Sequence, residues 1–348
     1  MTDSSNNVMG LVPPPPLPPP PAPPSTGMAT NTFFSQITDL TAGLWSPIAV
    51  PMIDGAKNVL TRYITSATTH MIPTHTGYPV AVHEMLGSAQ GTLVVIHGLA
   101  SCSSDWVEFL KLAQYKFGRI LAVDIPGHGE SPFPPQHADV DPSCEFKWLI
   151  SAITESILAT TSRYEMITLV GNSMGGAIAA KIASVIPSRF DRLVLISPAG
   201  YPCDDAEKVR LTDRFSPKTF TDCCAMVDAL NSKPIHRALT LTTGFILKDR
   251  VSSPVVKMIC KSVREFPDDF IFVKSADLEM ITAKTLLIWG TEDKILPAKH
   301  VTHFTSIRNL TVELWPETGH CPQTESPLTV VSHIADFVSE NELEAADE

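Results

Sequence analysis

The sequence lacks the two features that direct a chain into or across a membrane. No basic segment followed by an apolar one stands at its start, and no charge-free apolar run of about 18 residues occurs anywhere. These absences argue against a signal peptide and against a membrane-spanning helix. We therefore expect a soluble, cytoplasmic protein.

Clusters of positive charge are also missing. The chain has 26 Lys and Arg residues against 37 Asp and Glu residues, and its formal net charge is -11. Binding to phosphate backbones depends on grouped Lys and Arg side chains. The sequence therefore argues against nucleic acid as a partner.

The seven cysteines form no pattern that binds a metal. No CxxC pair occurs, and the odd count leaves at least one thiol outside any disulfide scheme. His300 and His303 lie one helical turn apart, but no third ligand stands nearby in the sequence to complete a zinc site. We expect a reducing compartment, no metal and no cofactor.

Proline is concentrated rather than evenly spread. Ten of the 30 prolines lie between Pro13 and Pro24, in a run that offers no apolar face to bury. Such a run favours polyproline II, a solvated conformation without internal hydrogen bonds. Residues 1–30 are therefore predicted to be a disordered tail. Residues 340–348 carry five acids and no base, and they are predicted to be a second, acidic tail.

An amphipathic segment follows the proline-rich tail. Apolar residues recur there at spacings of three and four, at Phe33, Ile37, Leu40, Leu44 and Ile48. Residues 31–66 are predicted to be a helical extension that docks on the body of the protein or on a partner. The polar face of residues 31–48 carries no Lys or Arg, so a membrane surface is the weaker alternative. Residues 1–48 are thus the candidate region for a peripheral membrane or protein partner.

From residue 67 to residue 339, short apolar runs alternate with helical patterns. The predicted strands are a hairpin of residues 69–75 and 79–85, then 92–98, 119–127, 166–172, 192–198, 285–290 and 310–316. Helices are predicted near 146–162, from 173, near 297–306 and near 327–339. This alternation predicts an α/β fold with a mostly parallel sheet and helices on both faces. The pattern stops over about residues 201–282, which we interpret as a cap inserted over the carboxyl edge of the sheet, with helical segments at 220–230 and 253–263.

A serine flanked by glycines joins a predicted strand to a predicted helix. In LVGNSMGGAIAAKIA, residues 169–183, Ser173 stands between Gly171 and Gly175. In this context a G-x-S-x-G sequence forms a strained turn that exposes the serine hydroxyl at the top of the sheet. Glycine is needed where a side chain would collide with the neighbouring strand or helix. Ser173 is therefore the predicted nucleophile.

A serine nucleophile needs a base, and the base needs an orienting acid. Asp293 follows the predicted strand at 285–290, and His320 follows the one at 310–316. The chain order Ser, Asp, His at strand ends predicts a catalytic triad of Ser173, Asp293 and His320. Glu292 is the rival acid, because it directly precedes Asp293.

These residues make the chain similar to the α/β-hydrolase fold family over roughly residues 67–339. HGLASCSSDW, from His97, resembles the family's oxyanion loop, and DIPGHGES, from Asp124, resembles its loop after the next strand. The resemblance implies that the backbone N–H groups of Leu99 and Met174 form an oxyanion hole. It also favours Asp293 over Glu292 through the family's W-G-x-x-D pattern. By the same likeness, the side chains implied to be architectural are those of Asp124, His128 and Ser131, and His97 is expected to be a structural hydrogen-bonding residue.

Three functions remain open on this evidence. The leading hypothesis is a cofactor-free serine hydrolase that cleaves carboxylic esters, lipid esters included, so its partner would be a small acyl substrate. The elbow GNSMGG, with Asn172 before the serine, also resembles hydrolases that cleave carbon–carbon bonds in ring-opened aromatic products. That group usually has tryptophan after the catalytic histidine, where this chain has Cys321, and a cap arginine that we cannot match to Arg210, Arg214 or Arg237. The third hypothesis is a non-catalytic ligand-binding protein with the same fold. The sequence does not determine the oligomeric state.

Overall fold

The computed structural model describes residues 52–75, 77, 79–132, 142–265 and 272–344. The predicted tail of residues 1–30, the amphipathic segment of residues 31–48 and the final residues 345–348 lie outside these ranges. Within the described ranges, no helix is long and apolar enough to cross a membrane.

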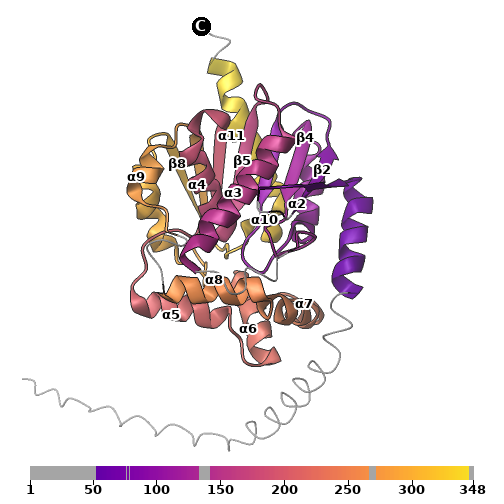
Figure 1. Ribbon diagram of the computed structural model, residues 1–348, viewed down its shortest axis with the longest axis vertical. Coiled ribbons are helices and arrows are strands. Elements are labelled where there is room, and N and C mark those ends of the chain that lie inside the picture. Colours follow the sequence, from indigo (N-terminus) through magenta and orange to yellow (C-terminus); the bar gives the residue numbers. More distant parts are fainter. Residues whose placement is uncertain (1–51, 76, 78, 133–141, 266–271, 345–348) are drawn as a thin grey trace, which may run out of the picture.

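One eight-stranded sheet forms the centre of the molecule (Figure 1). Its strands are β1 (Thr68–Ile72), β2 (Val80–Leu86), β3 (Thr92–Ile96), β4 (Arg119–Val123), β5 (Ile167–Asn172), β6 (Arg192–Ile196), β7 (Lys284–Gly290) and β8 (Leu310–Trp315). They stand in the order β1-β2-β4-β3-β5-β6-β7-β8. Strand β2 is antiparallel to both of its neighbours, β1 and β4. The six strands from β3 to β8 are all parallel to one another. The predicted α/β fold with a mostly parallel sheet is confirmed.

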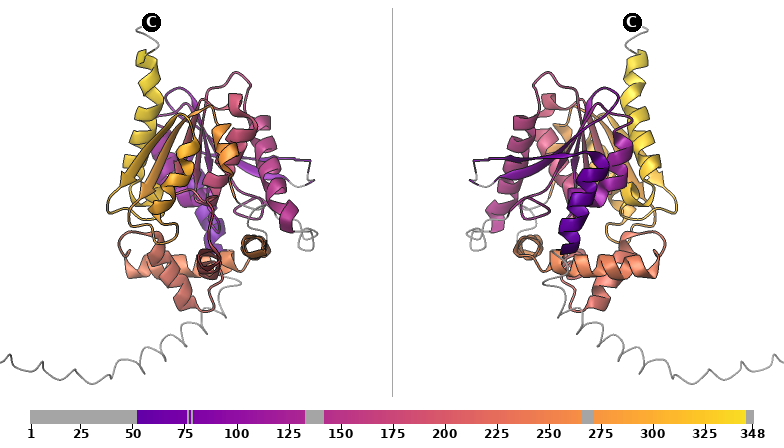
Figure 2. Two further views of the ribbon diagram at one scale, coloured as in Figure 1. Left: turned by 90° about the vertical axis from the view of Figure 1, so that its left-hand side faces the viewer. Right: turned by 90° about the vertical axis from the view of Figure 1, so that its right-hand side faces the viewer.

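Helices cover both faces of this sheet. On one face lie α3 (Pro142–Thr160) and α4 (Met174–Val185), and on the other lie α2 (Val107–Ala113) and α11 (Pro327–Glu344). Figure 2 shows α11, in yellow, on the side of the sheet opposite α3. The short helical segments are η1 (Ser103–Trp106), η3 (Pro187–Arg189), α9 (Ser275–Glu279), η4 (Ala298–Ser306) and α10 (Pro322–Glu325).

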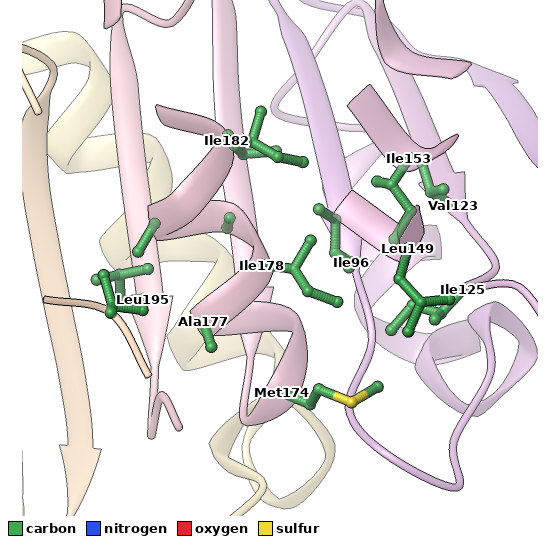
Figure 3. Packing of buried hydrophobic residues seen from close by; sticks show 14 of the residues in the cluster. Ile96, Val123, Ile125, Leu149, Ile153, Met174, Ala177, Ile178, Ile182 and Leu195 are labelled. Atoms are coloured by element: carbon green, nitrogen blue, oxygen red, sulfur yellow. The ribbon is translucent and has the colours of Figure 1, made fainter. Parts of the chain in front are cut away.

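Two apolar cores follow from this layering. Successive strand residues point to opposite faces, so Ile96 of β3 belongs to the core under α3 and α4, whereas Val95 belongs to the core under α2 and α11. Figure 3 shows Ile178 and Ile182 of α4 on the same side of the sheet as Ile96. Because the central strands are covered on both faces, their sequences are continuous apolar runs rather than alternating ones.

The chain between β6 and β7 forms the cap. It contains α5 (Asp205–Arg214), α6 (Phe220–Leu230), α7 (Arg237–Val251) and α8 (Pro254–Glu265). Figure 1 shows these helices as a layer across the end of the sheet at which β5 leads into α4. The sequence predicts α6 and α8 but neither α5 nor α7. Helix α5 has few apolar residues, and those of α7 are spread around the helix rather than gathered on one face, so packing rather than intrinsic pattern holds both helices in place.

A helix of residues 52–65 stands beside the sheet, with one end next to the cap (Figure 1). Its polar side chains face the body of the protein: Arg62 Nη1 lies 2.6 Å from Glu130 Oε1, and the carbonyl of Thr65 accepts a 3.0 Å hydrogen bond from Gln114 Nε2. Its outward face is apolar, with Leu60 56% exposed and Tyr63 83% exposed. The helix therefore lies within the predicted extension of residues 31–66 and is fixed to the body by charge and hydrogen bonds.

Asp124, which follows β4, connects the loops at the carboxyl edge of the sheet. Its carboxylate accepts hydrogen bonds of 2.8 Å from the N–H groups of Ser103 and Glu130, and His83 Nε2 lies 3.0 Å away. Burial alone would raise the pKa of Asp124, but the hydrogen bond and charge of His83 hold it well below its usual range. A Cβ at Gly129 would lie 2.0 Å from Asp124 Oδ2, so only glycine fits there. These contacts are structural, as the resemblance implies.

Two local predictions differ from the structure. Residues 298–306 form the 3-10 helix η4, because nine residues of apolar periodicity do not separate a period of 3.0 from one of 3.6. Helix α11 continues to Glu344, into the stretch predicted to be an acidic tail. Glu is a good helix former and no Gly or Pro stops the helix before that point.

The packing of α4 on the sheet yields a stability prediction. Replacing Ile178 with Ala should lower the free energy of unfolding by about 2–5 kcal/mol, because Ile178 is fully buried and a cavity would remain. Urea unfolding followed by circular dichroism measures the change. Val185→Ala is the matched control on the same helix, because Val185 is 69% exposed and should change stability by less than about 0.5 kcal/mol. Equal losses in the two variants would contradict the assigned core.

A second prediction concerns acid sensitivity. Burial, and to a smaller extent the neighbouring His97, lowers the pKa of His128 from 6.5 to about 3. Between these two pH values the unfolded chain binds a proton that the folded protein does not. The free energy of unfolding should therefore fall as pH falls, by up to about 1.4 kcal/mol per pH unit from this group. His128→Gln should make the pH dependence of urea unfolding shallower between pH 6 and 4, on the order of one proton less per molecule. An unchanged slope would show that His128 does not cause this pH dependence of the free energy of unfolding.

Candidate active site

Ser173 occupies a strained turn between β5 and α4. Its backbone has φ 56° and ψ −120°, in the left-handed half of backbone space that costs a non-glycine residue roughly 1–3 kcal/mol. The N–H of Ser173 donates to the carbonyl of Ile196 over 3.0 Å, and the carbonyl of Ser173 accepts from the N–H of Ala199 over 2.9 Å. Neighbouring residues at the end of β6 therefore hold the strained conformation from both sides.

The glycines around Ser173 permit the close packing of this turn. A Cβ at Gly175 would lie 2.3 Å from the carbonyl oxygens of Ile96 and His97, and a Cβ at Gly171 would lie 2.2 Å from the carbonyl oxygen of Gly175. Neither contact is one that a side chain can make. The physical reason for the G-x-S-x-G sequence is thus the close approach of the start of α4 to the end of β3 and to the end of β5.

His320 and Asp293 form a buried hydrogen-bonded pair. His320 Nδ1 lies 2.7 Å from Asp293 Oδ2, and the two residues follow β8 and β7. The other carboxylate oxygen of Asp293 accepts 2.8 Å hydrogen bonds from the N–H groups of Ile295 and Leu296. An ionised Asp293 is an acceptor only, so His320 carries its proton on Nδ1 and leaves Nε2 as the basic nitrogen. The rival acid, Glu292, is exposed.

Residues outside the predicted triad hold His320 in place. Its N–H donates to the carbonyl of Leu230 at the end of α6 over 3.0 Å. Its carbonyl accepts a 3.2 Å hydrogen bond from Asn172 Nδ2, which also donates to the carbonyl of Ile196 over 3.0 Å. Sequence reasoning treated Asn172 as part of the elbow and gave no role to Leu230. No local sequence signal marks either contact, because the residues lie far apart along the chain.

Glu325 links the loop before His320 to the cap. Its Oε1 accepts a 2.9 Å hydrogen bond from the N–H of Gly319, and its Oε2 accepts bonds of 2.9 Å and 2.7 Å from the N–H and hydroxyl of Ser232. The position of the histidine loop is thus coupled to the position of the cap.

The residues predicted to form an oxyanion hole lie beside Ser173. Met174 is the first residue of α4, where the backbone N–H has no acceptor within the helix. Leu99 follows Gly98, at which a Cβ would lie 3.2 Å from the Cβ of Ser173. The turn after Leu99 has Ala100 at φ 58° and a 3.3 Å hydrogen bond from the N–H of Ser101 to the carbonyl of Gly98. Leu99 and Met174 therefore both lie next to the serine and line the same pocket with it.

Two pockets meet at Ser173. The first, here called the apolar pocket, holds about 920 Å³ of empty space, part of it open to solvent, and Met174, Phe215 and Leu296 line it together with Leu211, Ile259 and Val263. The second, here called the cap cleft, holds about 1280 Å³ on the same measure, and its lining includes His320, Asn172, Ile246 and Arg250. Leu99, Ser173 and Phe215 line both. The serine therefore stands at the junction of a mainly apolar space and a more polar one.

The remaining candidate groups have other partners. His97 Nδ1 lies 2.8 Å from the carbonyl of Gly98, and its Nε2 accepts the N–H of Ile125 over 3.0 Å, so both ring nitrogens are used in the loop. His300 Nε2 lies 2.9 Å from Glu207, and His303 Nε2 lies 2.7 Å from the carbonyl of Val273. In the part of the chain that the structure describes, no group of three His, Cys, Asp or Glu side chains could hold a metal ion.

The arginines considered from sequence do not line the cap cleft. Arg210 contacts Glu207 and the carbonyl of Ile295 instead, and Arg237 is exposed. The cap arginine that does line the cleft is Arg250. Cys321, next to His320, is partly buried, and its loss of solvent raises the pKa of the thiol well above the usual value. It is therefore a neutral neighbour of His320 and not a second nucleophile.

Curated relatives are similar to this chain at low identity. The acetyltransferase component of the acetoin cleaving system of Pseudomonas putida, named for a dihydrolipoyllysine residue, is 26% identical over 267 residues, and the match covers 73% of this chain but 65% of that protein. The 2-hydroxy-6-oxononadienedioate/2-hydroxy-6-oxononatrienedioate hydrolase of Cupriavidus pinatubonensis is 26% identical over 270 residues, covering 72% of this chain and 88% of that one. The pimeloyl-(acyl-carrier protein) methyl ester esterase of Wigglesworthia glossinidia brevipalpis is 24% identical over 272 residues, covering 73% and 96%.

The fold has close counterparts among solved structures. A membrane phospholipase A described as a bacterial virulence factor superposes with a TM-score of 0.69 at 22% identity, covering 89% of this chain and 98% of that one. The model of the alpha/beta hydrolase family matches residues 93–333, which is more than half of the chain. The match spans nearly all of β3, the strands from β4 to β8, the serine elbow, Asp293 and His320, and it leaves out β1 and β2. The chain therefore belongs to the alpha/beta hydrolase family.

Proposed function

We propose that the protein is a serine hydrolase that cleaves carboxylic esters through an acyl-enzyme. The observation that carries this proposal is the position of Ser173, at the junction of two pockets and in the same cleft as a histidine oriented by a buried aspartate. A serine hydroxyl is a weak nucleophile until a neighbouring base accepts its proton. His320, with its Nδ1 proton directed at Asp293, is the base that the site offers.

Each residue has a defined step in this reaction. His320 Nε2 accepts the hydroxyl proton of Ser173 while the oxygen attacks the ester carbonyl carbon. The carbonyl oxygen gains the negative charge and accepts hydrogen bonds from the N–H groups of Leu99 and Met174. Protonated His320, stabilised by Asp293, then gives its proton to the leaving alcohol oxygen. Water then attacks the acyl-enzyme while His320 accepts its proton. His320 returns that proton to the oxygen of Ser173 as the acyl–serine bond breaks, and the acid is released.

The two pockets suggest how an ester lies in the site. The leaving oxygen must be within reach of His320, which lines the cap cleft. The acyl chain then extends to the other side of Ser173, into the apolar pocket with its side chains of Leu211, Phe215 and Leu296. Burial of each methylene in such a space contributes roughly 0.8 kcal/mol. A medium-length, mainly apolar acyl group fits this arrangement best.

The alternative is hydrolysis of a carbon–carbon bond, the class suggested by the elbow sequence and by the dienedioate hydrolase relative. A dioate substrate carries carboxylates, so its site needs an available positive group. Arg250 lines the cap cleft, but its Nη1 lies 2.7 Å from Asp105 and its Nη2 lies 2.9 Å from Asp54. A guanidinium already neutralised by two carboxylates attracts a third only weakly. This observation favours neutral esters.

The nucleophile prediction has a matched control in the neighbouring strand. Ser173→Ala should lower kcat on a p-nitrophenyl ester by at least about 10³-fold, because no other group forms the acyl-enzyme. Ser197, at the end of β6, is also buried and has a positive φ of 42°, but it is not a proposed catalytic residue. Ser197→Ala should retain activity within about threefold.

Labelling with a fluorophosphonate gives the complementary measurement. Wild type and Ser197→Ala should bind one equivalent of probe, and Ser173→Ala should bind none. Residual activity of Ser173→Ala within tenfold of wild type would refute the triad. Absence of both turnover and labelling in folded wild type would instead favour a non-catalytic binding protein.

The pocket assignment predicts a dependence on acyl length. With p-nitrophenyl esters from acetate to dodecanoate, kcat/KM should rise with chain length until the apolar pocket is full. Leu211→Trp should shift the optimum to shorter chains with little change for acetate, because the added volume occupies that pocket alone. An optimum that Leu211→Trp leaves unchanged would place the acyl chain elsewhere. Turnover of a ring-opened dienol acid more efficient than that of every ester would overturn the ester proposal.

A further inference from the structure

A cluster of four charged side chains joins three distant segments beside the oxyanion loop. Arg250 of α7 donates from Nη1 to Asp105 Oδ2 over 2.7 Å and from Nη2 to Asp54 Oδ1 over 2.9 Å. Lys57 forms an ion pair with the other oxygen of Asp105. Asp54 and Lys57 belong to the helix of residues 52–65, and Asp105 belongs to η1. The cap, the first described helix and the loop after β3 therefore converge on this cluster.

Asp105 closes the loop that contains Leu99. Its Oδ2 accepts hydrogen bonds from the hydroxyl of Ser101 over 2.7 Å and from the N–H of Cys102 over 3.1 Å. Between Leu99 and Ser101 stands Ala100 with φ 58°, a conformation that an L-residue keeps only when its surroundings enforce it. The carboxylate of Asp105 thus holds Ser101, whose N–H donates to the carbonyl of Gly98, and that carbonyl belongs to the same planar peptide unit as the Leu99 N–H.

The position of Asp105 in turn depends on the cations. Burial alone would raise the pKa of this carboxyl, but Arg250 and then Lys57 hold it well below its usual range. The side chain of Arg250 is only 15% exposed, so the guanidinium and the carboxylates compensate one another in a largely desolvated place. Removing one member of such a cluster leaves a buried charge without its partner. The remaining side chains would then move toward water.

We propose that this cluster holds the oxyanion loop in its working geometry, with Arg250 and Asp54 as positioning residues that act through Asp105 on the Leu99 N–H. The inference rests on the proposed function and extends it: the helix of residues 52–65 becomes a working part of the catalytic unit. Arginine suits this role because its planar fork binds two carboxylates at once in fixed directions. The simpler alternative, in which the cluster only fastens the cap, makes different predictions.

The test compares Arg250→Gln with Arg119→Gln in the full chain. Arg119, at the start of β4, also bonds two carboxylates, with Nε 2.6 Å from Glu84 and Nη1 3.1 Å from Glu165, but it lies at the opposite end of the strand from Asp124. Both variants should lower the Tm. Arg250→Gln should also lower kcat on a p-nitrophenyl ester by about 10- to 100-fold with KM changed less than threefold, because a displaced oxyanion donor weakens the transition state alone. Arg119→Gln should keep kcat within about twofold.

Two further measurements separate positioning from fastening. A trifluoromethyl ketone forms a tetrahedral adduct with the serine, so its inhibition constant should rise in Arg250→Gln by about the factor that kcat falls. Arg250→Lys keeps the charge but not the fork, and it should recover part of the kcat. Asp54→Asn, which removes the carboxylate that binds Arg250 from the helix of residues 52–65, should lower kcat about three- to tenfold and provides the test if Arg250→Gln fails to fold.

The outcomes distinguish this inference from the proposed function. If Arg250→Gln and Asp54→Asn lower the Tm but leave kcat and the inhibition constant at wild-type values, the cluster is only a fastener and the inference is wrong. If wild type shows no turnover of esters that depends on Ser173, the proposed function itself fails. A parallel loss of kcat and inhibitor affinity, partly recovered in Arg250→Lys, supports the positioning role.

Discussion

The contact between the start of α4 and the end of β3 is the constraint on which the rest of the site depends. The carbonyl oxygens of Ile96 and His97 leave no room for a Cβ at Gly175, so the helix begins directly against the sheet. Ser173 must then turn through a positive φ, and hydrogen bonds to the end of β6 hold it there. Met174 at the start of this helix and Leu99 in the loop after β3 line the same pocket as the serine. One steric condition therefore places the serine and both proposed oxyanion donors.

The cap holds in place residues that follow the carboxyl ends of the strands. His320 follows β8, yet its N–H binds the carbonyl of Leu230 on α6, and Glu325 ties its loop to Ser232. On the other side of the serine, Arg250 of α7 binds the loop after β3 through Asp105. The cap therefore contacts the histidine side and the oxyanion side at once. The cap cleft beside Ser173 is therefore lined on both of these sides by residues that the cap contacts.

The sequence predicted the parts of the fold that depend on local pattern. Strand and helix alternation, the G-x-S-x-G elbow and the acid and histidine after successive strands are all readable within a few residues, and the sheet and the His320–Asp293 contact agree with them. The sequence did not predict helices α5 and α7, because tertiary packing and not apolar periodicity holds them. The role of Arg250 could not be found in the same way, since its partners Asp105 and Asp54 lie 145 and 196 residues away. Such contacts exist only once the cap has closed over the sheet.

The buried carboxylates near the site are satisfied by different kinds of partner. Asp293 and Asp124 each accept two backbone N–H groups from nearby loops, in addition to a histidine, so their positions follow from the chain path itself. Asp105 accepts one backbone N–H and otherwise depends on side chains, two of them cations from other segments. Backbone donors persist through most substitutions, whereas a side-chain partner is lost by a single one. The positions of Asp293 and Asp124 should therefore tolerate most substitutions. The position of Asp105, and with it the loop after β3, depends on side chains from distant segments.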